Sequence, residues 1–154
     1  MRTARNKTPV LYDGKEDSVQ IGKGIVLTEG SDVAIIACGV LVHESLAAAE
    51  ILRKDGINAK VVDMHTIKPL DTDLIDKLSE ECGAIVTAED HSIIGGLGGA
   101  VSEHVVSSRP VPIEKIGVKD RFGESAGAEE MLEMMGLKSH HICEAVRTVI
   151  ARKV

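Results

Sequence analysis

The sequence has no tryptophan, one tyrosine and one phenylalanine among its 154 residues. Proteins that bind nucleic acids stack bases on aromatic side chains and attract phosphates with a positive surface. This chain has 18 basic and 24 acidic residues, which gives a net charge of −6. We therefore expect no nucleic-acid partner.

Long apolar runs and paired cysteines are also missing. No apolar run reaches the ~18–20 residues that a membrane span needs, and the polar, basic segment 1–10 is not a secretory signal. The three cysteines, Cys38, Cys82 and Cys143, are odd in number and have no C-x-x-C spacing. These features argue against a disulfide scaffold and a zinc knuckle, so we expect a cytoplasmic protein without membrane contact.

The first 22 residues are polar and turn-rich, and we interpret 1–22 as a leader from a preceding domain and 23–154 as an α/β domain. Residues 1–15 contain four basic residues and a single acidic residue, Asp13, so this segment carries a positive net charge. This segment is either a solvated leader or an anion site at the domain edge.

From residue 24 onward, apolar runs of strand length alternate with stretches of helical periodicity. Two runs joined by a four-residue turn, Gly24–Thr28 and Asp32–Cys38, predict an antiparallel hairpin. Later strands are expected at 60–64, 84–88 and 111–116, with helices between them and two more in the tail. Near-continuous apolar strands alternating with amphipathic helices indicate a parallel sheet covered on both faces. We predict a three-layer α/β/α sandwich with a mixed sheet of about five strands and one antiparallel edge strand.

Ligands of such sheets bind beyond the carboxyl ends of the strands. The candidates there are His65, Glu89, Asp90 and His91. A carboxylate beside a histidine suits proton transfer near neutral pH. Acidic residues and histidines in these loops also cap helices and face water, and that interpretation is favoured for each of the four.

A glycine run at 95–99 lies between a predicted strand and a predicted helix, where a phosphate cradle would be placed. Val101 stands where a dinucleotide fingerprint needs glycine, and the run lacks the lysine of a P-loop. We therefore predict that these glycines allow close packing of the helix.

The pair His140–His141 has helical spacing with Glu144. Such a group can bind a metal ion, but the exposed start of a helix is the favoured explanation, so we predict no metal site in the chain.

Five segments carry a family resemblance: G-K-G at 22–24, H-T-I-K-P-L-D at 65–71, I-V-T-A-E-D-H at 85–91, G-G-L-G-G-A-V-S-E at 95–103 and D-R-F-G-E-S at 120–125. With them the chain resembles the C-terminal domain of transketolase over nearly its whole length, and the split transketolases most closely. Ala126 departs from the pattern, because the family usually has glycine there. Deoxyxylulose-phosphate synthase and the beta subunits of 2-oxoacid dehydrogenases share some of these elements.

The resemblance implies an enzyme of the pentose phosphate pathway that moves a two-carbon ketol unit between sugar phosphates. It implies thiamine diphosphate and Mg²⁺ in the full enzyme, which is a homodimer, and as partners the thiamine-diphosphate-binding and pyrimidine-binding domains. The G-D-G motif for the diphosphate is absent from this chain, and the family's catalytic glutamate belongs to another domain. We expect no cofactor site and no catalytic residue here, and no activity from the chain alone.

The resemblance also points to Arg5, four residues before Pro9, as a ligand of the substrate phosphate. Arginine pairs bidentately with phosphate, although a solvated leader is an equal alternative. Two other functions stay open. One is a non-catalytic interaction or regulatory module, and the other is the equivalent domain of deoxyxylulose-phosphate synthase or of a 2-oxoacid dehydrogenase beta subunit.

Overall fold

The computed structural model describes residues 8–12 and 19–153 of the chain. In this part, one mixed five-stranded sheet has the strand order β1-β3-β2-β4-β5. The strands are β1 (Ile25–Val26), β2 (Val33–Ala37), β3 (Ala59–Asp63), β4 (Ile85–Ser92) and β5 (Ile113–Val118). The helices are α1 (Leu41–Lys54), α2 (Thr72–Cys82), α3 (Leu97–Ser107), α4 (Ala128–Met134) and α5 (Ser139–Ile150).

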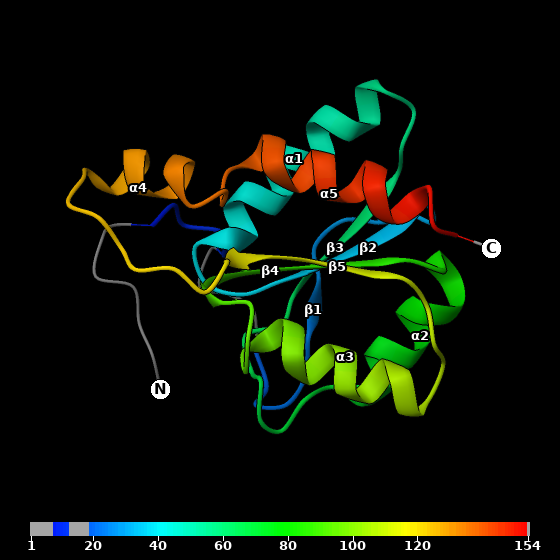
Figure 1. Cartoon of the computed structure of the whole chain (residues 1–154). Coiled ribbons are helices and arrows are strands. Elements are labelled where there is room, and N and C mark those ends of the chain that lie inside the picture. The colour runs from blue at the N-terminus through cyan, green and yellow to red at the C-terminus, as the bar shows by residue number, and fades with distance from the viewer. Residues whose placement is uncertain (1–7, 13–18, 154) are drawn as a thin grey trace.

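Helices lie on both sides of the sheet (Figure 1). α1 and α5 pack together on one face, and α2 and α3 pack on the other. The three layers and the mixed sheet confirm the predicted fold class. None of the helices in the described residues is long and apolar enough to cross a membrane.

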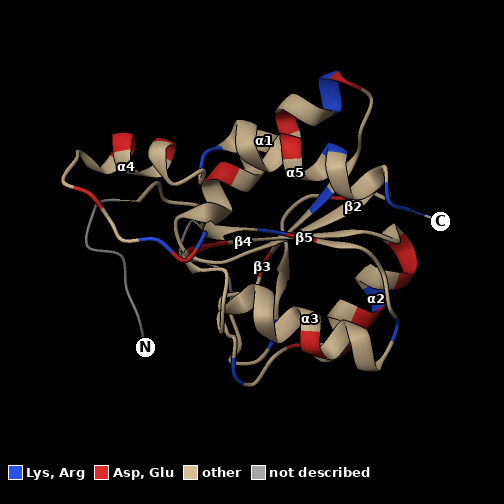
Figure 2. Ribbon diagram, viewed as in Figure 1, with Lys and Arg blue, Asp and Glu red and all other residues tan. Residues whose placement is uncertain are grey.

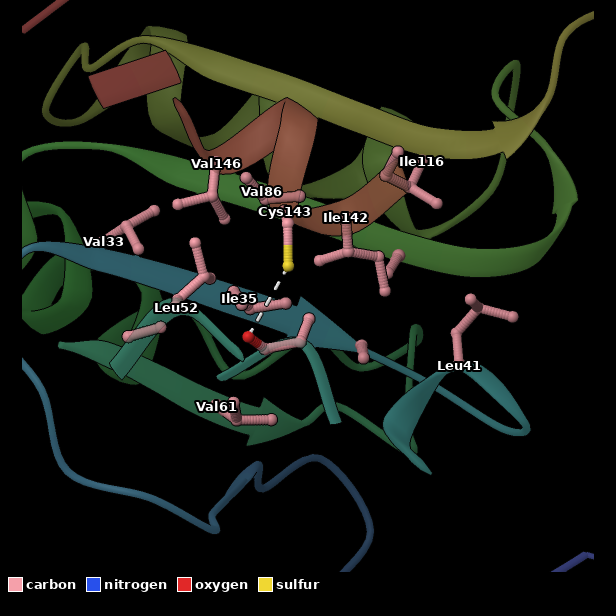
Figure 3. Close-up of a cluster of buried hydrophobic side chains, with 14 of the residues drawn as sticks. Val33, Ile35, Leu41, Leu52, Val61, Val86, Ile116, Ile142, Cys143 and Val146 are labelled. Carbon is pink, nitrogen blue, oxygen red and sulfur yellow. Dashed lines mark hydrogen bonds between the residues drawn. The ribbon is translucent and has the colours of Figure 1, made fainter. Parts of the chain in front are cut away.

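The side chains of β2 point alternately into two hydrophobic cores. Val33, Ile35 and Ala37 belong to the core under α1 and α5, whereas Ala34 and Ile36 belong to the core above α2 and α3. All five are fully buried, as expected for a central strand covered on both faces. Figure 3 shows the first core, where the Cys143 thiol donates a hydrogen bond of 3.6 Å to the carbonyl of Ala48.

The predicted hairpin between residues 24–28 and 32–38 is wrong. β1 pairs antiparallel with β3, with Ile25 opposite Asp63 and Val26 opposite Val62. β2 is instead parallel to β3 on one side and to β4 on the other. Both edges of β2 are therefore occupied, and the short, half-exposed β1 pairs with the outer edge of β3 instead.

β4 is longer than the sequence predicts. The expected strand ends at Ala88, but β4 continues to Ser92 through an irregularity in its pairing with β5. After the pair Ala88–Ile116, the next is Ser92–Val118. The candidate residues 89–91 consequently lie near the end of the strand and not in the loop after it.

Candidate functional site at the carboxyl edge of the sheet

Four parallel strands end at one edge of the sheet. We call the loops that follow β2, β3, β4 and β5 the carboxyl edge; they are residues 38–40, 64–71, 93–96 and 119–127. This is where open α/β sheets bind ligands. His65 lies in one of these loops, whereas Glu89, Asp90 and His91 precede another.

Glu89 is a buried carboxylate, only 2% exposed, at the N-terminus of α3. Its two oxygens accept hydrogen bonds from the backbone N–H groups of Leu97 and Gly98, each at 2.8 Å. These N–H groups have no partner inside the helix, and the positive end of the helix dipole favours a negative charge there. Glu89 therefore fixes α3 to the end of β4, in line with the helix-capping alternative.

The glycine run serves the same contact. A Cβ atom at position 96 would overlap the Glu89 carboxylate, and one at position 98 would lie 2.8 Å from Thr87 Oγ1. Glycine is required because α3 approaches β4 so closely. The predicted close packing is confirmed, and the helix N-terminus that a phosphate would use is already neutralised by Glu89.

The remaining candidates of the carboxyl edge are exposed. His91 Nδ1 donates a hydrogen bond of 2.9 Å to the carbonyl of Ser92 and lies 3.8 Å from Glu89 Oε2. His65 Nδ1 lies 3.0 Å from Thr66 Oγ1. β2 lies between β3, which precedes His65, and β4, which contains His91, so these two strands are about 10 Å apart. Glu89 and His91 are brought together, but both oxygens of Glu89 are already hydrogen-bonded.

Sequence reasoning did not single out Asp63, the last residue of β3. It is 7% exposed, and its Oδ2 accepts a hydrogen bond of 2.7 Å from the Tyr12 hydroxyl. Its Oδ1 is buried without a hydrogen-bond partner among the described residues. The bond holds Tyr12 beside the carboxyl edge, and no sequence signal links positions 12 and 63. The candidate Arg5 lies outside the described residues.

Two segments that carry the family resemblance meet at Asp71, which caps α2. Its carboxylate accepts hydrogen bonds from Leu74 N at 3.3 Å, Gly24 N at 3.0 Å and Lys23 Nζ at 3.2 Å. Burial raises the pKa of Asp71, but the hydrogen bonds from Gly24, Lys23 and Leu74 outweigh burial, so its pKa lies below the ordinary value. The G-K-G and K-P-L-D segments thus form one structural unit that joins β1 to α2.

The family model "Transketolase, C-terminal domain" matches residues 22–142, which include β1 to β5 and α1 to α4. The chain belongs to this family.

Relatives of this transketolase C-terminal domain include both separate subunits and parts of longer chains. It is 42% identical over 144 residues to a 6-deoxy-6-sulfo-D-fructose transketolase subunit of Clostridium sp., covering 94% of this chain and 45% of the relative. It is 41% identical over 140 residues to 1-deoxy-D-xylulose-5-phosphate synthase of Crocosphaera subtropica, covering 90% of this chain and 22% of the relative.

A solved structure of a split-gene transketolase, described as an inactive beta4 tetramer, has a TM-score of 0.94 to this chain at 41% identity. The similarity covers 97% of this chain and 49% of that one. The transketolase C-terminal domain described here therefore spans about half the length of the split relatives.

The N-termini of α2 and α3 do not fit the diphosphate of thiamine diphosphate. A diphosphate needs free backbone N–H groups at a helix N-terminus or a cationic cradle. At α3 the Glu89 carboxylate occupies the N–H groups of Leu97 and Gly98, and at α2 Asp71 occupies that of Leu74. Negative side chains at both positions would repel the diphosphate.

Apolar side chains are exposed on three loops of the carboxyl edge. Ile67, Ile94 and Phe122 follow the ends of β3, β4 and β5, and Phe122 is 96% exposed. Phe122 is the single phenylalanine of the chain. Such exposure is typical of a surface that another protein covers.

Proposed function

We propose that the chain is the C-terminal section of a thiamine-diphosphate-dependent transketolase, which transfers a two-carbon ketol unit between sugar phosphates. The observation that carries this proposal is the family match over residues 22–142. The chain would act within an assembly of which the thiamine-diphosphate-binding and pyrimidine-binding domains are the other parts, with a homodimer as the full enzyme. In that assembly the cofactor and Mg²⁺ are held by the partner domains.

The chain's own contribution is structural. Glu89 and Asp71, two buried carboxylates near the carboxyl edge, are both bound to helix N-termini. A carboxylate whose oxygens accept backbone hydrogen bonds is a poor general base. The solved relative that consists of one kind of subunit is described as inactive. Both observations support a chain that has no activity alone and that completes the enzyme by contact.

For Arg5 we propose a contact with the substrate phosphate. The support is its position four residues before Pro9 and the hydrogen bond to Asp63 that holds Tyr12 beside the carboxyl edge. In the assembled enzyme, Arg5→Ala should lower kcat/KM by the equivalent of roughly 2–4 kcal/mol, as for the loss of a buried charge partner. Arg2→Ala is the matched control, and unchanged kinetics for Arg5→Ala would exclude Arg5 from the site.

Complementation tests the proposed function. The cofactor-binding and pyrimidine-binding domains of the same source would be mixed with the 154-residue chain, and ketol transfer from a ketose phosphate to an aldose phosphate would be followed. We expect activity from the mixture and none from either part alone. If the chain binds those domains without restoring transfer, it is a non-catalytic interaction or regulatory module.

A second candidate is the equivalent domain of deoxyxylulose-phosphate synthase. The observation that favours it is the 41% identity over 140 residues to the Crocosphaera enzyme. Product analysis of the assembled protein separates the two reactions, because only the synthase forms deoxyxylulose phosphate. We place either assembly in the cytoplasm, in keeping with the buried thiols of Cys82 and Cys143, whose pKa values are raised by burial.

A further inference from the structure

Three potential metal ligands meet where α4 is followed by α5. Glu133 lies near the end of α4, and His140 and His141 lie in the first turn of α5. One ligand atom from each residue lies within 4.8 Å of the other two. Glu133 Oε1 is 3.1 Å from His140 Nε2, and the two imidazole rings are tilted by 37° with their centroids 3.9 Å apart.

We propose that Glu133, His140 and His141 bind a divalent transition-metal ion of the zinc type. Two imidazole nitrogens and one carboxylate oxygen form a ligand set that zinc accepts, and softer sulfur ligands are not needed. Three protein ligands leave one tetrahedral position for water or another molecule. The proposal does not depend on the transketolase activity.

To bind a zinc ion, the three ligand atoms need to move only slightly closer together. Ligand atoms around a tetrahedral zinc ion are about 3.4 Å apart, given zinc–ligand bonds of about 2.0–2.1 Å. The pair Glu133–His140 is already at 3.1 Å. Both side chains are exposed and can change rotamer at little cost. His141 Nδ1 is buried and has no hydrogen-bond partner among the described residues, so no hydrogen bond at that nitrogen holds the ring in its orientation.

The backbone that carries the cluster is fixed by contacts of other residues. Gly136 has a φ of +75°, which turns the chain from α4 toward α5. Lys138 Nζ donates hydrogen bonds to Glu129 Oε2 at 2.8 Å and to Glu44 Oε1 at 2.7 Å, and these bonds raise its pKa to about 12. Glu44 Oε2 also accepts a hydrogen bond of 2.8 Å from Ser139 N. Because Glu44 occupies the start of α5, Glu133 remains available for a metal ion.

The cluster opens onto a cavity. Glu133 and His141 line a cavity of about 320 Å³ together with Lys119, Arg121 and Glu144. This cavity gives a bound ion room for a fourth ligand. Glu144, which the helical spacing groups with the two histidines, lines the cavity but does not belong to the ligand cluster. Glu133 replaces it and comes from α4, which carries acidic residues along its length (Figure 2).

Titration of the metal-free 154-residue chain with Zn²⁺, followed by calorimetry, tests the site, and the visible spectrum of Co²⁺ reports the ligand geometry. We expect one ion per chain at about pH 7.5, where histidine is neutral. Affinity should fall at about pH 5.5, because imidazole must be deprotonated to bind a metal.

Two single substitutions decide the assignment. His140→Ala and Glu133→Gln should each weaken binding by at least the ~10–100-fold that loss of a supporting partner costs at metal sites, and should change the Co²⁺ spectrum. His65→Ala, which removes an exposed histidine at the carboxyl edge, should leave both unchanged. The substituted side chains at 133 and 140 are exposed, and an unchanged circular dichroism melt would verify folding.

The proposal is overturned if the wild-type chain shows no saturable binding at concentrations on the order of 10 μM. It is also overturned if both variants bind as the wild type does, which would assign the ion to other residues, such as the cysteines. The contact of 3.1 Å between Glu133 Oε1 and His140 Nε2 would then be the whole role of the cluster.

Discussion

Two buried carboxylates show that surroundings, and not residue type, decide the role of an acidic side chain. Glu89 accepts hydrogen bonds from Leu97 N and Gly98 N, and Asp71 accepts one from Leu74 N. The sequence carries the signature of the cap at Asp71, because this aspartate precedes an apolar stripe of helical period. For Glu89, sequence reasoning favoured capping over acid–base chemistry but did not identify the helix that is capped, because the closeness of α3 to β4 is a property of the folded chain.

The lowered pKa of Asp71 predicts a pH-dependent contribution to stability. Burial raises this pKa, but the hydrogen bonds from Gly24, Lys23 and Leu74 lower it further than burial raises it. The contribution is therefore complete above the unfolded pKa, about 3.9, and is lost as the pH falls through the lower folded pKa. Asp71→Asn should cost about 1–2 kcal/mol near pH 7 and progressively less below about pH 4.

Urea unfolding of both proteins between about pH 7 and pH 3 measures this difference. Asp73→Asn is the matched control, since Asp73 is an exposed neighbour whose Oδ2 lies 3.6 Å from Lys23 Nζ. It should change the free energy of unfolding by less than about 0.5 kcal/mol. A cost for Asp71→Asn that stays constant down to pH 3 would show that its ionisation is not what stabilises the fold.

At the scale of elements, local patterns predicted which segments form strands and helices but not all of their partners. The helices with buried Leu97, Val101 and Val105 in α3 and with buried Ile142 in α5 agree with their apolar periodicity. The predicted partner of β1 was wrong because a strand of two residues carries little information on register. In addition, the outer edge of β3 exists only after the sheet has formed. The helical spacing groups His140 and His141 with Glu144, whereas the structure places Glu133, from the other helix, beside them.

The close packing of α3 on β4 predicts opposite changes in the free energy of unfolding for alanine substitutions at two glycines of the run 95–99. In Gly96→Ala the new Cβ would overlap the Glu89 carboxylate and break the cap, so the free energy of unfolding should fall by about 2–3 kcal/mol. Gly99 lies inside the helix with no atom within 4 Å of an added Cβ. Gly99→Ala should therefore stabilise the chain by about 0.5–1 kcal/mol.

Chemical denaturation of the two variants against the wild type checks this contrast. Equal stability of Gly96→Ala and Gly99→Ala would contradict this prediction. It would mean that the Glu89 carboxylate does not need the space at position 96 and that the glycines serve only backbone flexibility.

At the scale of the whole molecule, the two faces of the sheet are closed by helices while the carboxyl edge carries exposed apolar side chains. Sequence reasoning located this edge, because parallel strands that alternate with helices place their ends together. It favoured helix caps for the acidic residues of this edge, but the backbone N–H groups that Glu89 binds follow only from the folded chain. An edge whose loops expose Ile67, Ile94 and Phe122 is suited to contact with another protein.

If the cofactor-binding domains cover this edge, as the proposed function implies, Phe122 is an anchor of that interface. Phe122→Ser should leave the free energy of unfolding within about 0.5 kcal/mol, because the side chain is 96% exposed. It should weaken assembly with the partner domains by about 30-fold, the equivalent of a ~2 kcal/mol hot spot. Titration of the partner domains, read out by light scattering and by restored ketol transfer, measures this loss.

Val106→Ser is the control for this experiment. Val106 is also exposed but lies in the last turn of α3, away from the carboxyl edge, where α3 begins. It should leave both stability and assembly unchanged. If Val106→Ser weakens assembly and Phe122→Ser does not, the partner domains contact the opposite edge. The exposure of Phe122 would then need another explanation, while the family membership and the fold would be unaffected.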